Sequence, residues 1–220
     1  NKISLFGDLQ MRFVNYKTSG LTSDRVNMLI DENYNFFNPK AGITYKLNPE
    51  NNLYFSYARA NREPSRSDFE SNPNIKPEQL NDLELGWRHN TNALIINTNV
   101  YYMLYNEQLV LSGAIDNTGA PIRTNSGASY RLGLEVEATL QVSKKLAIQP
   151  NLTFSSNKNK QTISQIDGEL VDLGKTNISF SPDLVAANAL IYQPISNLQL
   201  SFLSKYVGEQ YMGNTDSEAS

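Results

Sequence analysis

The sequence predicts an all-β chain of antiparallel strands that run up and down in succession, and three observations support this fold class. Hydrophobic and polar residues alternate with a period of two, as in strands with one apolar and one polar face. Several expected strands reach about a dozen residues, whereas strands of soluble sheets favour about five to six. Long and short connections alternate along the chain. Together these features indicate the wall of an outer-membrane β-barrel, whose tilted strands need about 9–11 residues to cross the bilayer.

The clearest element is a hairpin between Tyr130 and Phe154. In its first strand Leu132, Leu134, Val136, Ala138, Leu140 and Val142 alternate with Arg131, Gly133, Glu135, Glu137, Thr139 and Gln141. A turn over residues 143–145 leads into a second strand with Leu146, Ile148, Leu152 and Phe154 on its apolar side. Pro150 falls on that side in mid-strand, so we expect a bulge or an unpaired position there.

The other strands are expected, in chain order, over residues 3–17, 36–47, 53–60, 82–88, 94–111, 177–192 and 198–211. With the hairpin, this makes about nine consecutive strands. Long polar connections are expected over residues 18–34, 61–77, 112–124 and 157–175, and short turns over residues 48–51, 89–92, 143–145 and 193–197. In outer-membrane barrels the short turns are periplasmic and the long loops extracellular. Tyr45, Trp87 and Tyr192 each precede a short turn, where an interfacial aromatic girdle is expected.

Composition excludes several classes of protein. The chain has 220 residues, a formal net charge of −3 and no cysteine, and its sequence pI is about 5.3. We therefore expect no nucleic-acid partner, because such partners require a basic patch, and no disulfide framework or thiolate metal site. No run approaches the 18 or more apolar residues that a membrane-spanning helix needs. The mean hydropathy of −0.44 is compatible with a barrel, because only every second residue faces lipid.

Six blocks carry a resemblance to one known family. They are Phe37–Gly42, Arg62–Phe69, Lys76–Glu78, Leu83–Gly86, Arg123–Asn125 and Tyr130–Glu135. In order and spacing they resemble the barrel of a TonB-dependent outer-membrane receptor. The resemblance implies a 22-stranded barrel closed by a plug domain in the outer membrane of a Gram-negative bacterium. It also implies TonB-energised uptake of a scarce nutrient, with a ferric siderophore or another iron chelate as the expected cargo.

We expect residues 1–220 to form a C-terminal part of such a barrel, without its plug domain and last strand. On this interpretation, contact with TonB is made by the missing N-terminal part, and the apolar face contacts outer-membrane lipid. Two unpaired sheet edges and a greasy face would make the isolated fragment prone to self-association.

Four residues are candidates for the substrate side: Arg62, Arg66, Asp68 and Asn125. Arg62 and Arg66 could bind an anionic iron chelate, because guanidinium groups pair well with carboxylates. The alternative is that Arg62, Arg66 and Asp68 pair with Glu63, with one another or with the barrel wall, and only order the loop.

Five charged residues are expected to face the lumen: Glu84, Arg88, Arg131, Glu135 and Glu137. Glu135 and Glu137 lie two residues apart on one strand face, as a glycosidase pair could, but no cleft motif accompanies them and lining of a polar lumen is the simpler interpretation. The motifs of nucleophilic hydrolases, nucleotide-binding loops and zinc proteases are absent. We therefore predict no enzyme activity, no metal site and no cofactor.

Two other functions remain open at this point. One is a passive outer-membrane pore or adhesin barrel, which would have no plug domain. The other is a soluble β-sandwich or glycan-binding module, in which Leu132, Leu134, Val136 and Leu140 would pack into a closed core.

Overall fold

The computed structural model describes residues 1–22, 25–115, 119, 121–166 and 169–216. Its elements, in chain order, are β1 (Ile3–Leu21), β2 (Asn27–Asn48), β3 (Asn51–Arg62), α1 (Arg66–Ser71), β4 (Glu78–Asn90), β5 (Leu94–Asn106), β6 (Leu109–Ile115), β7 (Pro121–Asn125), β8 (Ser129–Ser143), β9 (Leu146–Asn159), β10 (Ile163–Ile166), β11 (Glu169–Asp172), β12 (Thr176–Asn177), β13 (Leu184–Ile195) and β14 (Leu198–Val207).

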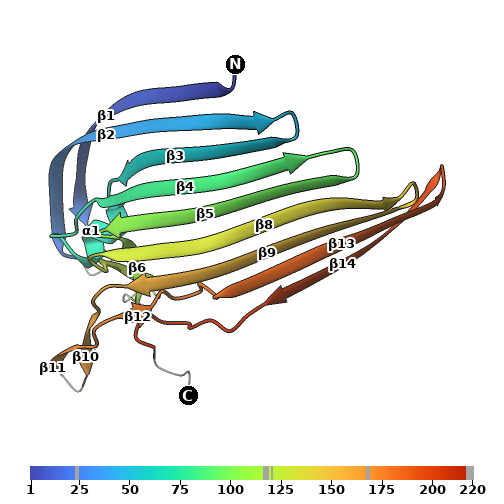
Figure 1. Cartoon of the computed structure of the whole chain (residues 1–220). Helices are drawn as coiled ribbons and strands as arrows, with labels where there is room; N and C mark the ends of the chain where they lie inside the picture. Colours follow the sequence, from blue (N-terminus) through green and yellow to red (C-terminus); the bar gives the residue numbers. More distant parts are fainter. Residues whose placement is uncertain (23–24, 116–118, 120, 167–168, 217–220) are drawn as a thin grey trace.

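One antiparallel sheet dominates the molecule. Its strand order is β1-β2-β3-β4-β5-β8-β9-β13-β14, and the two-residue strand β12 pairs with β9. The nine long strands therefore neighbour each other in chain order, which confirms the predicted up-and-down section of a large barrel. The short turns gather at one end of the sheet, and the long connections, with α1 and the hairpins β6–β7 and β10–β11, gather at the other (Figure 1). Within the described residues no helix is long and apolar enough to span a membrane.

Several predicted boundaries were wrong. Residues 18–34, expected as a polar loop, mostly continue a hairpin in which β1 and β2 have 19 and 22 residues. The expected loop over residues 61–77 contains α1. Strand β5 ends at Asn106 instead of residue 111, because Glu107 adopts a positive φ of 52° and β6 then pairs with β7.

The C-terminal strands are also shorter than expected. Strand β13 begins at Leu184 instead of residue 177, after Phe180 with φ 53°, and β14 ends at Val207 instead of residue 211. No bulge occurs at Pro150. The pairs between β9 and β8 stop at Asn151 and resume in the same register at Ile148. Pro150 is therefore unpaired on the side of β8, which was the second of the two expectations.

The sheet has no conventional interior. Among the described residues, the buried apolar cluster is Met28, Ile30, Phe69, Ile75 and Leu109, all at the loop end. By contrast Leu132, Leu134 and Leu140 are 43%, 39% and 41% exposed. A closed soluble core around these leucines, as a β-sandwich requires, is therefore contradicted.

Candidate functional site

An uninterrupted row of apolar side chains crosses one face of the sheet. The cross-strand pairs link Leu5, Ile43, Phe55, Leu85, Val100, Leu134, Phe154 and Leu184, from β1 to β13. Alternate residues above and below this row on the same strands are mostly apolar as well, among them Leu53, Leu83, Leu132 and Leu152. We call this surface the apolar belt. Exposure of such a continuous apolar surface indicates an apolar solvent or partner.

The upper limit of the apolar belt runs obliquely across the strands. Its slope gives the angle by which the strands tilt from the normal to the plane of the belt. On β9 the belt ends at Phe154, which lies in the row of Leu5, whereas on β1 it continues eight residues further, to Phe13. Eight residues span about 26 Å along a strand, and the six strand spacings from β1 to β9 span about 29 Å. The ratio corresponds to a tilt of about 42°, within the 35–45° of transmembrane barrels.

The two faces of the β1–β2 hairpin exchange polarity above Phe13. On the belt side the next residues are polar: Asn15 donates to Asn33 at 2.6 Å, and Lys17 pairs with Asp31 at 2.8 Å. On the opposite side Ile30 and Met28 are buried against Phe69 of α1. The apolar belt of this hairpin therefore ends at Phe13, and beyond it the apolar side of the hairpin faces the loops.

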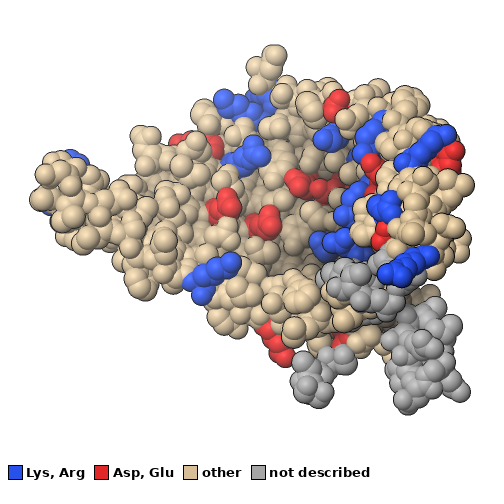
Figure 2. All heavy atoms as spheres, turned by 180° about the vertical axis from the view of Figure 1, so that it is seen from behind, with Lys and Arg blue, Asp and Glu red and all other residues tan. Residues whose placement is uncertain are grey.

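The opposite face of the sheet is polar. By strand register Glu84, Arg88, Arg131, Glu135 and Glu137, the five residues expected to face the lumen, all lie on this face. Figure 2 shows acidic and basic side chains gathered on a hollowed face of the molecule. We call this the inner face.

Charged and aromatic groups on the inner face are paired with each other. The Arg88 guanidinium lies 4.6 Å above the Tyr54 ring, and that of Arg131 lies 5.3 Å from the Tyr105 ring. Glu137 accepts a hydrogen bond from Asn151 at 3.0 Å. Near Tyr54 and Arg88 the wall has a depression of about 140 Å³. In the described part of the chain no three His, Asp or Glu side chains form a metal site.

Two tyrosines lie flat across glycines of the neighbouring strand. A Cβ atom on Gly86 would collide with the Tyr54 ring, and one on Gly133 would collide with Tyr101 and with the Phe154 carbonyl oxygen. Both glycines are needed for this close approach, not for an unusual φ. Alternation along single strands does not predict these contacts, because the tyrosine that faces each glycine depends on the register between strands.

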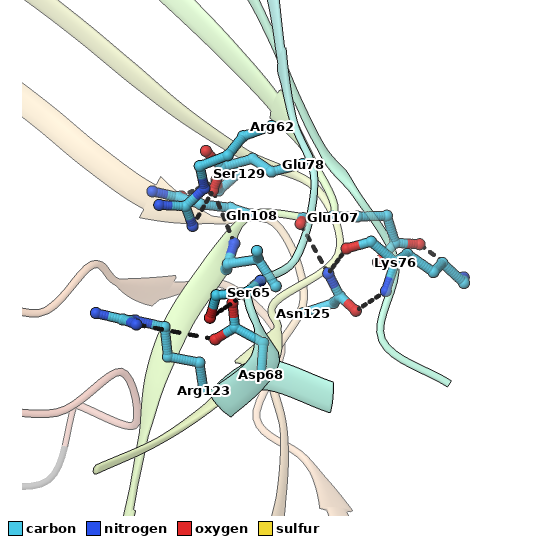
Figure 3. Close-up of polar contacts among 11 residues, drawn as sticks. Arg62, Ser65, Asp68, Lys76, Glu78, Glu107, Gln108, Arg123, Asn125 and Ser129 are labelled. Carbon is cyan, nitrogen blue, oxygen red and sulfur yellow. Dashed lines mark hydrogen bonds and ion pairs between the residues drawn. The ribbon is translucent and has the colours of Figure 1, made fainter. Parts of the chain in front are cut away.

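At the loop end, the candidate residues of α1 and its surroundings are held by the protein itself (Figure 3). Asp68 closes a capping box with Ser65, accepting its N–H and hydroxyl at 2.8 Å each, and lies 3.8 Å from Arg123. Arg66 pairs with Glu70 at 2.7 Å and donates to the Thr18 hydroxyl and the Leu21 carbonyl of β1.

Arg62 and Glu63 make different kinds of contact. Arg62 is 54% exposed along its side chain and lies 3.8 Å from Glu78. Glu63 accepts hydrogen bonds from both terminal nitrogens of Arg12, and the Arg12 guanidinium also lies over the Phe36 ring. Arg62 is therefore the less firmly held of the two candidate arginines, Arg62 and Arg66.

Asn125 joins two loops that are far apart in sequence. Its Nδ2 donates to the carbonyls of Lys76 and Glu107 at 3.0 and 2.9 Å, and its Oδ1 accepts the Lys76 N–H at 2.9 Å. Lys76 and Glu107 also form an ion pair at 2.8 Å. We call this set of contacts the loop joint (Figure 3).

Two further bonds support the loop joint. Glu78 accepts the Leu109 N–H at 2.8 Å, and Ser129 donates to buried Gln108 at 2.6 Å. The structure thus brings all four substrate-side candidates to one end of the sheet. Their contacts favour a role in ordering the loops, and contact with a ligand stays a prediction.

A family model described as "TonB dependent receptor-like, beta-barrel" matches residues 4–220. The chain is similar in structure to the copper transporter OprC, with a TM-score of 0.75 and 18% identity over 97% of this chain and 33% of that one. It is also similar to the ferric-catecholate import receptor Fiu from E. coli K12 (TM-score 0.65, 15% identity, 94% of this chain and 32% of that one). A third is the FrpB iron transporter from Neisseria meningitidis (TM-score 0.62, 15% identity, 94% of this chain and 31% of that one).

The chain spans about a third of the length of these solved structures. At such identities the likeness shows the fold alone. No curated protein matches the sequence. The family model, however, covers nearly all of the chain. The strands, their tilt and the two-faced polarity of the sheet agree with that match. The chain therefore belongs to the TonB-dependent receptor-like β-barrel family.

Proposed function

We propose that this chain is a section of the wall of an outer-membrane, TonB-dependent transporter that imports a scarce nutrient. The observation that carries the proposal is the apolar belt on one face of a sheet whose other face is charged. A barrel wall between hydrocarbon and a watery interior requires this division. The chain performs no catalysis on this proposal.

On this proposal, the inner face and the loop end of the sheet have different roles. The inner face holds a plug domain by polar contacts, and the loop end receives the cargo. The plug and the segment that contacts TonB belong to parts of the receptor outside these residues. A passive pore or adhesin barrel would have the same belt but no plug, so the sequence of the whole receptor distinguishes the two functions.

The proposed cargo is a ferric siderophore or another iron chelate. Support comes from the printed functions of similar structures: an import receptor for ferric catecholate, an iron transporter and a siderophore receptor from Pseudomonas aeruginosa. The copper transporter among them makes a copper complex the alternative cargo. Growth of a receptor-deletion strain on single iron or copper sources, with and without the intact gene, separates these two.

Assembly of the intact receptor tests the wall itself. Val136→Arg puts a charge near the middle of the belt on β8, which runs from Leu132 to Val142, and should cost about 2–4 kcal/mol. Glu135→Arg, on the adjacent residue, changes the inner face and should assemble much better. The measurement is the amount of heat-resistant barrel in isolated outer membranes. Equal assembly of the two variants would refute the proposal.

A further inference from the structure

We infer that the outer surface of β8 and β9 carries a binding site for a phosphate-bearing lipid headgroup, formed by Tyr130, Lys158 and Lys175 just above the apolar belt. The inference rests on the proposed function, because it requires the belt to lie in a bilayer. It adds a specific lipid contact to the general lipid contact of the belt.

Strand register places the site at the edge of the membrane. Tyr130 pairs with Lys158, on the same face as Leu132 and Phe154. Phe154 is the last apolar residue of the belt on β9, and Lys158 lies four residues further along the strand, about 13 Å. With the tilt of about 42°, the Lys158 backbone stands about 10 Å above the end of the belt, in the headgroup layer.

The side chains form a compact cationic group. The Lys175 ammonium lies 4.8 Å from the centre of the Tyr130 ring, and Lys158 donates a hydrogen bond to the Asn177 side chain. Tyr102 packs on the other side, with its ring centre 6.1 Å from that of Tyr130. Tyrosine at the bilayer surface, with its ring towards the belt and its hydroxyl towards water, is typical of membrane interfaces.

The charge of the two lysines is not cancelled by an ion pair. Within the described ranges, neither Lys158 nor Lys175 forms a salt bridge, whereas Lys17 at the edge of the belt on β1 is paired with Asp31. The neighbouring carboxylate, Asp216, accepts the Asn177 N–H at 2.7 Å.

A phosphate group suits this arrangement. Two ammonium groups and a phenol hydroxyl supply charged and neutral donors to its oxygen atoms, while the acyl chains of the same molecule extend down the belt. Free phosphate would gain only the first of these interactions. The site therefore favours a lipid over a soluble anion.

The test uses the full-length receptor in detergent, with phosphatidic acid as the anionic probe, phosphatidylcholine as the neutral one and inorganic phosphate as the free one. Native mass spectrometry measures retained lipid. The double variant Lys158→Gln/Lys175→Gln should bind phosphatidic acid about 30-fold more weakly, given roughly fivefold for each lysine near an anionic membrane surface. The matched control, Lys144→Gln/Lys145→Gln, changes the net charge equally at the turn end of the same hairpin.

Weaker binding of phosphatidic acid by Lys158→Gln/Lys175→Gln, with unchanged binding by Lys144→Gln/Lys145→Gln, supports the site. Equal weakening in both double variants would show an effect of net charge alone and overturn the site, as would displacement of the lipid by an equal concentration of inorganic phosphate or equal retention of phosphatidylcholine. If the unaltered receptor does not enter the outer membrane, the proposed function is refuted, and this site with it. A receptor that inserts but does not distinguish the lipids refutes the site alone.

Discussion

Gly86 and Gly133 should tolerate a methyl group far less well than Gly42, although all three lie on the inner face. On Gly86 a Cβ would stand 2.5 Å from Tyr54 Oη and closer to two ring carbons. Tyr54 could swing away, at the cost of its contact with Arg88, about 0.5–2 kcal/mol, and of a strained rotamer, about 0.5–1.5 kcal/mol. Gly86→Ala should therefore destabilise the receptor by about 1–3.5 kcal/mol.

Gly133→Ala should cost more. Its Cβ would lie 2.5 Å from Tyr101 Cζ and 2.8 Å from the Phe154 carbonyl oxygen, which belongs to the backbone of β9 and cannot rotate away. Gly42→Ala is the control, since its neighbours would be at 3.5 and 3.7 Å, in ordinary contact. Alanine also reduces the entropy that glycine loses on folding, so this control should be neutral or slightly stabilising.

The assay is urea unfolding of the full-length receptor in detergent micelles, followed by tryptophan fluorescence. Removing the ring should relieve one variant and not the other: Gly86→Ala/Tyr54→Ala should be no less stable than Tyr54→Ala, whereas Gly133→Ala/Tyr101→Ala should stay less stable than Tyr101→Ala. Equal destabilisation of the three single variants would refute the reasoning, as would relief of both glycine variants by removal of the tyrosine.

Three further predictions concern the loop end. Asn125→Ala should accelerate hydrogen exchange of the Lys76 amide, whereas Asn125→Asp, which keeps the acceptor oxygen, should do so less; equal rates would contradict the loop joint. Phe69→Ala empties a site that is 3% exposed and should lower the local unfolding free energy around α1 by about 3–5 kcal/mol, measured as faster proteolysis of that loop in an otherwise heat-stable barrel. Arg66→Ala should release α1 from β1, whereas Arg62→Ala should change stability by less than about 1 kcal/mol. Because the Arg62 variant stays folded, weaker binding of the cargo by this variant would indicate that Arg62 contacts the cargo directly. Unchanged binding would argue against that contact.

Alternation along single strands was enough to predict which side chains share a face. Leu134 and Glu135 differ in polarity and are neighbours in sequence, and a strand must send them to opposite sides. The same logic placed Glu84, Arg88 and Arg131 together before any strand pairing was known. It failed over residues 18–34, because the hairpin there carries polar residues outward and apolar ones inward, the reverse of the pattern below Phe13.

Contacts between loops could not be predicted in this way. Asn125 contacts Lys76, 49 positions earlier in the sequence, and Glu107, 18 positions earlier. Alternation within a strand carries no information about contacts between residues so far apart in the sequence. The sequence analysis named Arg62, Arg66, Asp68 and Asn125 as candidates, with ordering of the loop as the alternative for the first three, but only the structure shows that Arg66, Asp68 and Asn125 bind other parts of the chain. The structure also shows the contacts of Arg12 and Arg123, which were not among the site candidates.

The sequence by itself determined the class of fold, the order of the strands and the two polarities of the wall, because each follows from the period of a strand and from the lengths of its connections. Only the tertiary structure decided the tilt, the tyrosines packed on glycines and the loop joint. These depend on register, which a chain of alternating residues restricts only to steps of two, and register is fixed by the pairing of whole strands.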